Sequence, residues 1–278
     1  MSLSTTNTAQ IEYWNGRAGE KWSAMQTSLD VMLASATLEL KRRVGIVSGQ
    51  RVLDIGCGTG ETCLIWLDGK ANVTGVDVSA PMLALAADRT KGKVELIKAD
   101  ASRWISSTPF DLAVSRFGVM FFDDPGQAFT SIAGNIRPGG RMVFVCWRQQ
   151  KENAWVTTPM EAIRDLLPES PPAESHAPGP FALADKERLK GILERAGFAN
   201  VSIESHDIQV CLANEGGVDS AVGFITQIGP SGAALAEASS EIRATAAERL
   251  KTALAPHEKN NRVTLGGAVW IVEAIKRG

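Results

Sequence analysis

The sequence predicts a doubly wound α/β fold, in which helices cover both faces of a Rossmann-like sheet. Short apolar runs rich in β-branched residues recur through the middle of the chain and alternate with helical segments. Several of these runs are continuous, which is typical of parallel strands buried on both faces. A chain of 278 residues is long enough for one large or two small domains with a substantial core.

Five strands are expected in the core, and helical segments lie between them. The expected strands are residues 51–55, 73–78, 94–97, 111–115 and 142–147. Ser79 followed by Pro81 is typical of a helix start, and Asp124 opens a second helix that is expected to run to about Arg137. The Pro-Gly-Gly stretch at 138–140 is expected to break the chain before the fifth strand.

The regions outside this core are expected to cover it. Residues 1–48 are predicted to be a helical cover, because apolar residues recur there near the helical period. The remaining domain, 49–278, has two expected lid or cap insertions, at 149–184 and 213–266. The first contains a long irregular stretch with clustered prolines, and the second a helical run at 233–254. A further helix and two strands are expected at 185–196, 201–212 and 268–275.

Composition and charge exclude several classes of protein. The apolar fraction of 44% and the charged fraction of 22% are those of an ordinary globular chain. A net charge of −2 offers no basic field for nucleic acid or anionic lipid. There is no apolar run of transmembrane length and no signal-peptide layout, and the four cysteines lack metal or disulfide spacing. We therefore expect a cytoplasmic protein with free thiols, no nucleic-acid partner and no membrane insertion.

The most specific motif is the strand and glycine-rich turn DIGCGTG at 54–60. Its glycines allow a tight turn and a close ligand, and the following helix offers free N–H groups. A dinucleotide fingerprint would need Gly or Ala where Glu61 stands. Asp54 would also face a pyrophosphate, and two like charges 4 Å apart cost about 4 kcal/mol at an effective dielectric of 20. A ligand with an ammonium or sulfonium group, such as S-adenosylmethionine, is favoured instead.

Two later carboxylates end the next two strands. Asp77 lies 23 positions after Asp54, where a carboxylate can accept hydrogen bonds from both ribose hydroxyls. The alternative is that Asp77 only orders the following turn. Asp100 can accept a hydrogen bond from an adenine amino group, with the N–H of Ala101 or Ser102 reaching a ring nitrogen. It can equally cap a turn.

These motifs resemble the class I S-adenosylmethionine-dependent methyltransferases, of the ubiquinone/menaquinone-type small-molecule subgroup, over about residues 45–148. The stretch at 137–141 is similar to the family's turn before the fifth strand. The resemblance implies a seven-stranded sheet of order 3-2-1-4-5-7-6 with the last strand antiparallel. It also implies that residues around Tyr13, Trp14 and Trp22 fold over the cofactor, although they can equally pack as an ordinary helix. The implied cofactor residues are Asp54, Gly56, Cys57, Gly58, Thr59, Gly60, Asp77, Val78, Met82, Asp100, Ala101, Ser102, Ser115, Phe117, Tyr13, Trp14 and Trp22.

The apolar loop at 117–122 predicts a small, partly apolar acceptor. Phe117 is expected to face the cofactor, and Phe121 and Phe122 to lie mostly in the core. The candidates for acceptor binding are Arg116, Met120 and Arg148, and the two arginines can orient an anion or form exposed salt bridges. His176, in the proline-rich stretch, is a weak candidate for a general base against a solvated loop residue.

No metal is expected, since Asp123 and Asp124 suit a helix N-cap better than a Mg²⁺ site. Two other functions remain open. A cofactor-binding protein of the same fold without methyl transfer would share every binding motif. An NAD-dependent oxidoreductase explains the α/β pattern but not Asp54 or Glu61. The acceptor atom and the oligomeric state do not follow from the sequence.

Overall fold

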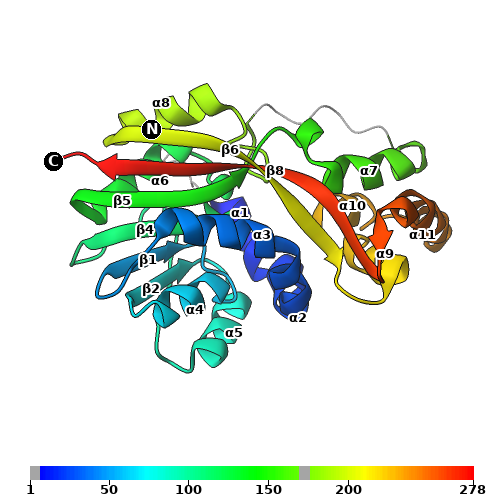
Figure 1. Ribbon diagram of the computed structural model, residues 1–278, viewed down its shortest axis with the longest axis horizontal. Helices are drawn as coiled ribbons and strands as arrows, with labels where there is room; N and C mark the ends of the chain where they lie inside the picture. The colour runs from blue at the N-terminus through cyan, green and yellow to red at the C-terminus, as the bar shows by residue number, and fades with distance from the viewer. Residues whose placement is uncertain (1–6, 169–175) are drawn as a thin grey trace.

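The computed structural model describes residues 7–168 and 176–278, which fold around one sheet (Figure 1). The strand order is β3-β2-β1-β4-β5-β8-β6, and the short strand β7 pairs only with β8. Strands β1 to β5 pair in parallel, and β8 is antiparallel to β5 and β6. The strands are β1 (Arg51–Ile55), β2 (Asn72–Asp77), β3 (Glu95–Lys98), β4 (Phe110–Arg116), β5 (Ile136–Trp147), β6 (Phe198–Ala213), β7 (Glu258–Lys259) and β8 (Arg262–Lys276). The predicted order, 3-2-1-4-5-7-6, is confirmed. Strand β8 is the strand expected as the seventh, and its number is higher by one because the short strand β7 precedes it in the chain.

Helices cover both faces of this sheet, as predicted (Figure 1). One face carries α3, α4 and α5, and the other carries α6 and α8. The short helices α1 and α2 precede α3 at the end of the sheet where the parallel strands finish. The bounds are α1 (Thr8–Asn15), α2 (Arg17–Ala24), α3 (Gln26–Val44), α4 (Glu61–Asp68), α5 (Ala80–Thr90), α6 (Pro125–Gly134) and α8 (Lys186–Arg195).

Side-chain caps explain where α5 and α6 begin. The Ser79 hydroxyl accepts a hydrogen bond from the backbone N–H of Met82 at the start of α5. Asp124 caps α6 in the same way, through the N–H of Gln127 at 3.0 Å. Each cap satisfies a backbone N–H that the first helical turn leaves without an intrahelical partner. The N-cap interpretation of Asp124 is thereby confirmed.

The turn before the fifth strand differs from the prediction. Helix α6 ends at Gly134, and β5 already begins at Ile136, before the Pro-Gly-Gly stretch. The glycines produce an irregularity inside β5, where the pairing with β4 shifts by several residues. Gly139 has a φ of +73°, and a Cβ on Gly140 would lie 2.9 Å from the Asp111 carbonyl oxygen. The glycines therefore lie inside β5 and bend it. They do not separate helix α6 from the strand.

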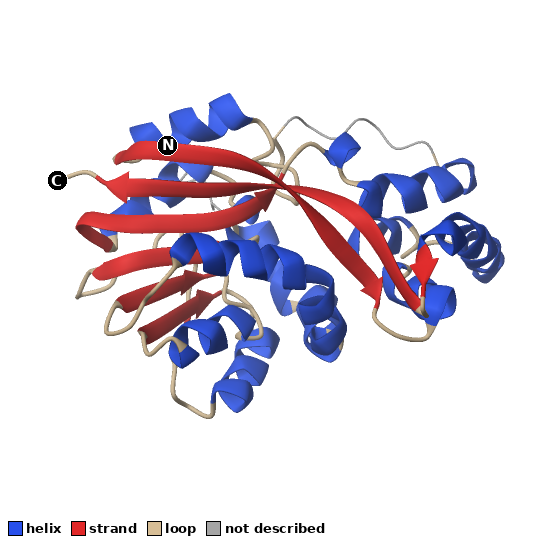
Figure 2. Cartoon of the chain, in the orientation of Figure 1, coloured by secondary structure: helices blue, strands red, loops and turns tan. Residues whose placement is uncertain are grey.

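Strands β6 and β8 extend beyond the other strands and carry a second group of helices (Figure 2). This helical lobe consists of α7 (Ala154–Ile163), α9 (Gly217–Ile225), α10 (Gly229–Ala234) and α11 (Ser240–Leu254). The region 149–184 is therefore less irregular than expected, because α7 forms around the buried side chains of Trp155, Val156 and Ile163. The helical run at 233–254 is divided between α10 and α11. Part of the expected irregular stretch, 169–175, lies outside the described residues.

The described helices include none that is long and apolar enough to cross a membrane. The boundary between a cover at 1–48 and a domain at 49–278 stays a prediction.

Candidate cofactor-binding site

A cavity lies at the carboxyl ends of β1, β2, β3 and β4, where the strand order reverses between β1 and β4. Open α/β sheets bind ligands at such a position. The cavity encloses about 1070 Å³, counted to include its open mouth, and most of its wall is apolar. Its wall includes these predicted residues: Gly56, Cys57, Gly58, Thr59, Asp77, Val78, Met82, Asp100, Ala101, Arg116, Phe117, Trp14 and Trp22.

The glycine loop contacts the loop that follows β4. Gly56 has a φ of +64°, and a Cβ there would lie 2.7 Å from the Gly118 Cα. A Cβ on Gly118 would lie 2.7 Å from the Ile55 carbonyl oxygen. The Ser115 hydroxyl holds this contact by donating to the Ile55 carbonyl oxygen at 2.8 Å. Gly60 and Ser115 do not line the cavity, so their effect on a ligand is through the shape of these loops.

Asp77 orders the glycine loop and faces the cavity at the same time. One carboxylate oxygen accepts from the N–H of Gly58 at 2.8 Å, and the other accepts from the N–H of Ser79 at 2.8 Å. Burial raises the pKa of Asp77, and these backbone donors oppose the shift. Each oxygen retains a further lone pair for a ligand. The two interpretations of Asp77 are therefore compatible.

Asp54 lies behind the glycine loop and does not line the cavity. It is fully buried, and burial raises its pKa to about 6 against the opposing hydrogen bonds of Thr62 and Cys63. Its Oδ1 atom has no hydrogen-bond partner among the described residues. Asp54 therefore acts on the cavity through its charge, across the loop, and not by direct contact.

The N-terminal segment ties together two loops at one end of the cavity. The Asn7 side chain donates to Asp100 Oδ1 at 2.9 Å, and that oxygen also accepts from the N–H of Ser102. The Asn7 backbone N–H donates to Asp123 at 2.6 Å, and the Asp123 N–H donates back to the Asn7 side chain. Asn7 lines the cavity, whereas Ser102 does not. No local sequence pattern marks an isolated asparagine for this position.

Aromatic residues form much of the remaining wall. Trp14 packs edge-to-face against Trp22 and against Phe121, at ring-centre distances of 5.4 and 5.3 Å. Phe121 and Phe122 line the cavity; Phe122 also belongs to the buried core, as expected, and the partly buried Phe121 packs against that core. Tyr13 is 56% exposed and lies outside the wall. The N-terminal helices thus place two tryptophans, and not the tyrosine, over the cavity.

Phe117 is held in an unusual conformation beside this wall. Its φ is +66°, which a bulky residue rarely adopts. Its ring stacks on Trp147 at 4.4 Å between ring centres, with 13° between the ring planes. Met120, three residues after Phe117, is 2% exposed and does not line the cavity.

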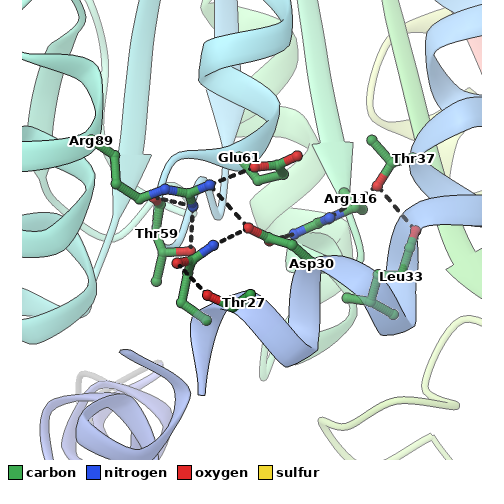
Figure 3. Close-up of polar contacts among 9 residues, drawn as sticks. Thr27, Asp30, Leu33, Thr37, Thr59, Glu61, Arg89 and Arg116 are labelled. Carbon is green, nitrogen blue, oxygen red and sulfur yellow. Dashed lines mark hydrogen bonds and ion pairs between the residues drawn. The ribbon is translucent and has the colours of Figure 1, made fainter. Parts of the chain in front are cut away.

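A network of charged residues links Arg116 of the cavity wall to the glycine loop (Figure 3). Arg116 lines the cavity and pairs with Asp30 of α3 at 3.6 Å. The other oxygen of Asp30 pairs with Arg89 at 3.0 Å, and Arg89 pairs with Glu61 at 2.6 Å. Arg89 also donates to the Thr59 carbonyl oxygen in the glycine loop. The network connects α3, α4, α5 and β4 around one end of the cavity.

Two predicted residues lie away from the cavity. Arg148 pairs with Glu152 and Asp207, and its guanidinium lies 5.3 Å from the Trp270 ring centre. His176 is exposed, and neither residue contributes to the wall. Among the described residues of the wall there is no histidine. The structure therefore brings neither candidate to the site.

Comparisons with known proteins agree with this geometry. Residues 53–144 match the family described as "Methyltransferase domain". The malonyl-[acyl-carrier protein] O-methyltransferase of Pseudescherichia vulneris is 31% identical over 147 residues, which cover 51% of this chain and 55% of that protein. The demethylmenaquinone methyltransferase of Renibacterium salmoninarum is 26% identical over 57% of this chain and 70% of its own length. The chain thus spans about half the length of the first relative.

Solved structures share the fold. Phosphoethanolamine N-methyltransferase 2 of Haemonchus contortus, in complex with S-adenosyl-L-methionine, superposes with a TM-score of 0.55 at 16% identity, over 96% of this chain and 60% of that one. The [4+2]-cyclase SpnF superposes with a TM-score of 0.53 at 20% identity, over 94% and 96% of the two chains. Residues 53–144 thus match a methyltransferase domain, and the glycine loop and the strand order agree with the class I S-adenosylmethionine-dependent type.

Proposed function

We propose that this protein transfers a methyl group from S-adenosylmethionine to a small, partly apolar acceptor bound in the same cavity. The observation that carries the proposal is the continuity of the cavity. One wall joins the glycine loop and the carboxylates of Asp77 and Asp100 to the aromatic residues around Phe117. When bound, the cofactor supplies a methyl group activated by the positive sulfonium.

The residues present fit this cofactor. In this proposal Asp77 accepts hydrogen bonds from the ribose hydroxyls, and Asp100 with Ala101 contacts the adenine ring. The buried Asp54, with one oxygen lacking a hydrogen bond in the described structure, favours a cationic group on the other side of the glycine loop. The same charge disfavours the pyrophosphate of a dinucleotide.

The residues around the reacting end would act by positioning and by excluding water. Trp14, Trp22 and Phe121 form an apolar cover at the cavity. A dry site strengthens the attraction between an electron-rich acceptor atom and a cationic donor. Holding the acceptor atom in line with the methyl group supplies much of the remaining rate. The proposal assigns no general base.

A second function has a specific observation in its favour. The [4+2]-cyclase shares this fold over nearly its whole chain, so the fold by itself does not require methyl transfer. An oxidoreductase is less compatible, because Glu61 starts α4 in an ion pair with Arg89 where a dinucleotide loop needs a small residue. The ubiquinone/menaquinone-type subgroup finds support in one relative at 26% identity, so demethylated quinols belong in an acceptor panel.

The test is transfer of a labelled methyl group from S-adenosylmethionine to a panel of phenols, quinols, amines, thiols and carboxylic acids. We expect label in at least one acceptor class. Asp77→Asn is expected to weaken S-adenosylhomocysteine binding by about tenfold or more, since it removes a charge-assisted acceptor. Asp111→Asn is the matched control, because Asp111 pairs with Arg137 away from the cavity. Tight cofactor binding with no labelled product across the panel would favour the non-methylating alternative.

A further inference from the structure

We infer that Arg116 is the anchor for a negatively charged group on the acceptor, so that the acceptor is a flat apolar molecule with one anionic group. This inference rests on the proposed function. It concerns the part of the cavity beyond the glycine loop, between α3 and the end of β4.

Arg116 is the basic residue of the cavity wall. In the described structure, the wall contains no other lysine or arginine. The Arg116 side chain is 13% exposed, so most of its charge is withdrawn from water. Burial lowers its pKa, and the nearby carboxylates of Asp30, Glu61 and Asp54 oppose the shift. A buried guanidinium in a ligand cavity is stabilised further by an anion that enters with the ligand.

The guanidinium group is oriented but not saturated. Its Nη1 donates to the Thr37 hydroxyl of α3 at 2.9 Å. Its Nη2 lies 3.6 Å from Asp30 Oδ1, which is an ion pair but too long for a hydrogen bond. Asp30 is also shared, because its other oxygen pairs with Arg89 at 3.0 Å. A guanidinium has five N–H donors, so donors remain for a carboxylate in the planar fork geometry that arginine favours.

The surroundings of Arg116 define the rest of the acceptor. Leu29 and Leu33 of α3 line the same cavity, and so does Asp30, whose carboxylate pairs with both Arg89 and Arg116. The neighbouring Phe117 contributes an aromatic ring whose orientation is fixed by stacking on Trp147. Aliphatic and aromatic walls beside one cation suit a flat apolar body with an anionic group.

The carboxylate that meets Arg116 has two sources, the acceptor or the methionine end of the cofactor itself. We assign it to the acceptor, because the sulfonium, ammonium and carboxylate of the cofactor sum to one positive charge, which Asp54 balances, so that Arg116 is left for a second ligand. Arg116 also adjoins Phe117 at the carboxyl end of β4, in the strand next to the one that carries the glycine loop.

The experiment measures binding of matched carboxylates and amides to the protein saturated with S-adenosylhomocysteine. The probes are benzoate with benzamide and cinnamate with cinnamamide, titrated by calorimetry. The wild-type protein is expected to bind at least one carboxylate about tenfold or more tightly than its amide, the usual strength of a charge-assisted hydrogen bond. Arg116→Gln is expected to abolish that preference, and Arg116→Lys to restore part of it.

Arg148→Gln is the matched control, because Arg148 is a cation paired outside the cavity. It should keep the wild-type preference. The inference is overturned if neither carboxylate binds more tightly than its amide, or if Arg116→Gln retains the preference. It is also overturned if Arg116→Gln loses affinity for S-adenosylhomocysteine but not for 5′-methylthioadenosine, which lacks the amino-acid part, because Arg116 then holds the cofactor. Failure of the wild type to bind S-adenosylhomocysteine would instead overturn the proposed function.

Discussion

Asp54 is buried behind the glycine loop, and its ionisation links the stability of the fold to pH. Burial raises its pKa to about 6, compared with about 3.9 in an unfolded chain. The folded state therefore binds this proton more tightly than the unfolded state. The resulting stabilisation is fully present below about pH 4 and is lost as the pH rises through about 6.

We expect Asp54→Asn to unfold with a free energy that no longer falls as the pH rises through about 6, because the amide is neutral at every pH. At pH 8 the variant should have the larger free energy of unfolding, by up to about 3 kcal/mol, since each pKa unit corresponds to about 1.4 kcal/mol. Near pH 4 the two proteins should converge. Urea unfolding at both pH values measures the difference, and a difference that does not change with pH would contradict this role.

At Gly118 a side chain would collide with the backbone of the glycine loop. A Cβ there would lie 2.7 Å from the Ile55 carbonyl oxygen and 2.8 Å from the Gly56 Cα, both backbone atoms that move only with the glycine loop. We expect Gly118→Ala to separate the two loops and to weaken S-adenosylhomocysteine binding by tenfold or more, roughly the loss of one charge-assisted hydrogen bond. The control is Gly223→Ala in α9, where a Cβ meets nothing within 4 Å. Equal affinity in both variants would argue against this contact.

At the scale of elements, helix α3 connects the N-terminal helices α1 and α2 to the glycine loop. Asp30 pairs with Arg116 of β4 and Arg89 of α5, and Gln26 of the same helix also donates to it (Figure 3). Arg89 in turn binds the glycine loop through the Thr59 carbonyl oxygen. The position of α3 is therefore coupled to the shape of the loop.

Asp30→Asn tests this coupling. Removing one partner from a buried ion pair costs about 3–5 kcal/mol. Without Asp30, Arg116 loses the carboxylate with which it pairs, whereas Arg89 keeps its pair with Glu61. We expect faster hydrogen exchange in α1 to α3 and a lower midpoint of urea unfolding. Glu39→Gln, on the same helix, removes contacts with Arg42 and His206 at the surface and should change stability by less than about 1 kcal/mol. Similar effects of the two substitutions would contradict the role of Asp30.

Elements with strong local signals could be predicted from the sequence. The parallel strands are continuous apolar runs, and the α5 and α6 starts have N-cap residues whose side chains make the expected hydrogen bonds. Helix α7 was not predicted in this way, because Pro159 lies inside it, although its buried residues recur at the helical spacing. Its packing through Trp155 and Val156 outweighs the local preference.

At the scale of the whole molecule, the sheet and the helical lobe are joined by more than the long strands β6 and β8. An aromatic series begins at Phe117 in the cavity wall, continues through Trp147 and ends at Trp155 of α7, whose ring centre lies 5.0 Å from that of Trp147. On the other side, Lys21 of α2 donates to the Gln227 carbonyl oxygen between α9 and α10. The lobe therefore contacts Trp147, which stacks on Phe117 of the cavity wall, and it also contacts helix α2.

The candidate site was predictable where its residues belong to one motif. The glycine loop, Asp77 and Asp100 follow successive strands, and parallel strands bring their carboxyl ends to one edge. The parts contributed from a distance were not predictable. Asn7 meets Asp100 and Asp123, and Asp30 meets Arg116, across long separations in the sequence that no local pattern records. Such contacts are specified by tertiary packing alone.

The most direct test of the central claim is a thermal melt with S-adenosylhomocysteine, with NAD⁺ as the comparison ligand. A ligand at one hundred times its dissociation constant stabilises the folded state by about 2.7 kcal/mol. For a chain of this size we expect a rise in Tm of roughly 5–10 °C with S-adenosylhomocysteine and none with NAD⁺. A rise with NAD⁺ alone, or no rise with S-adenosylhomocysteine, would contradict a cavity built for S-adenosylmethionine.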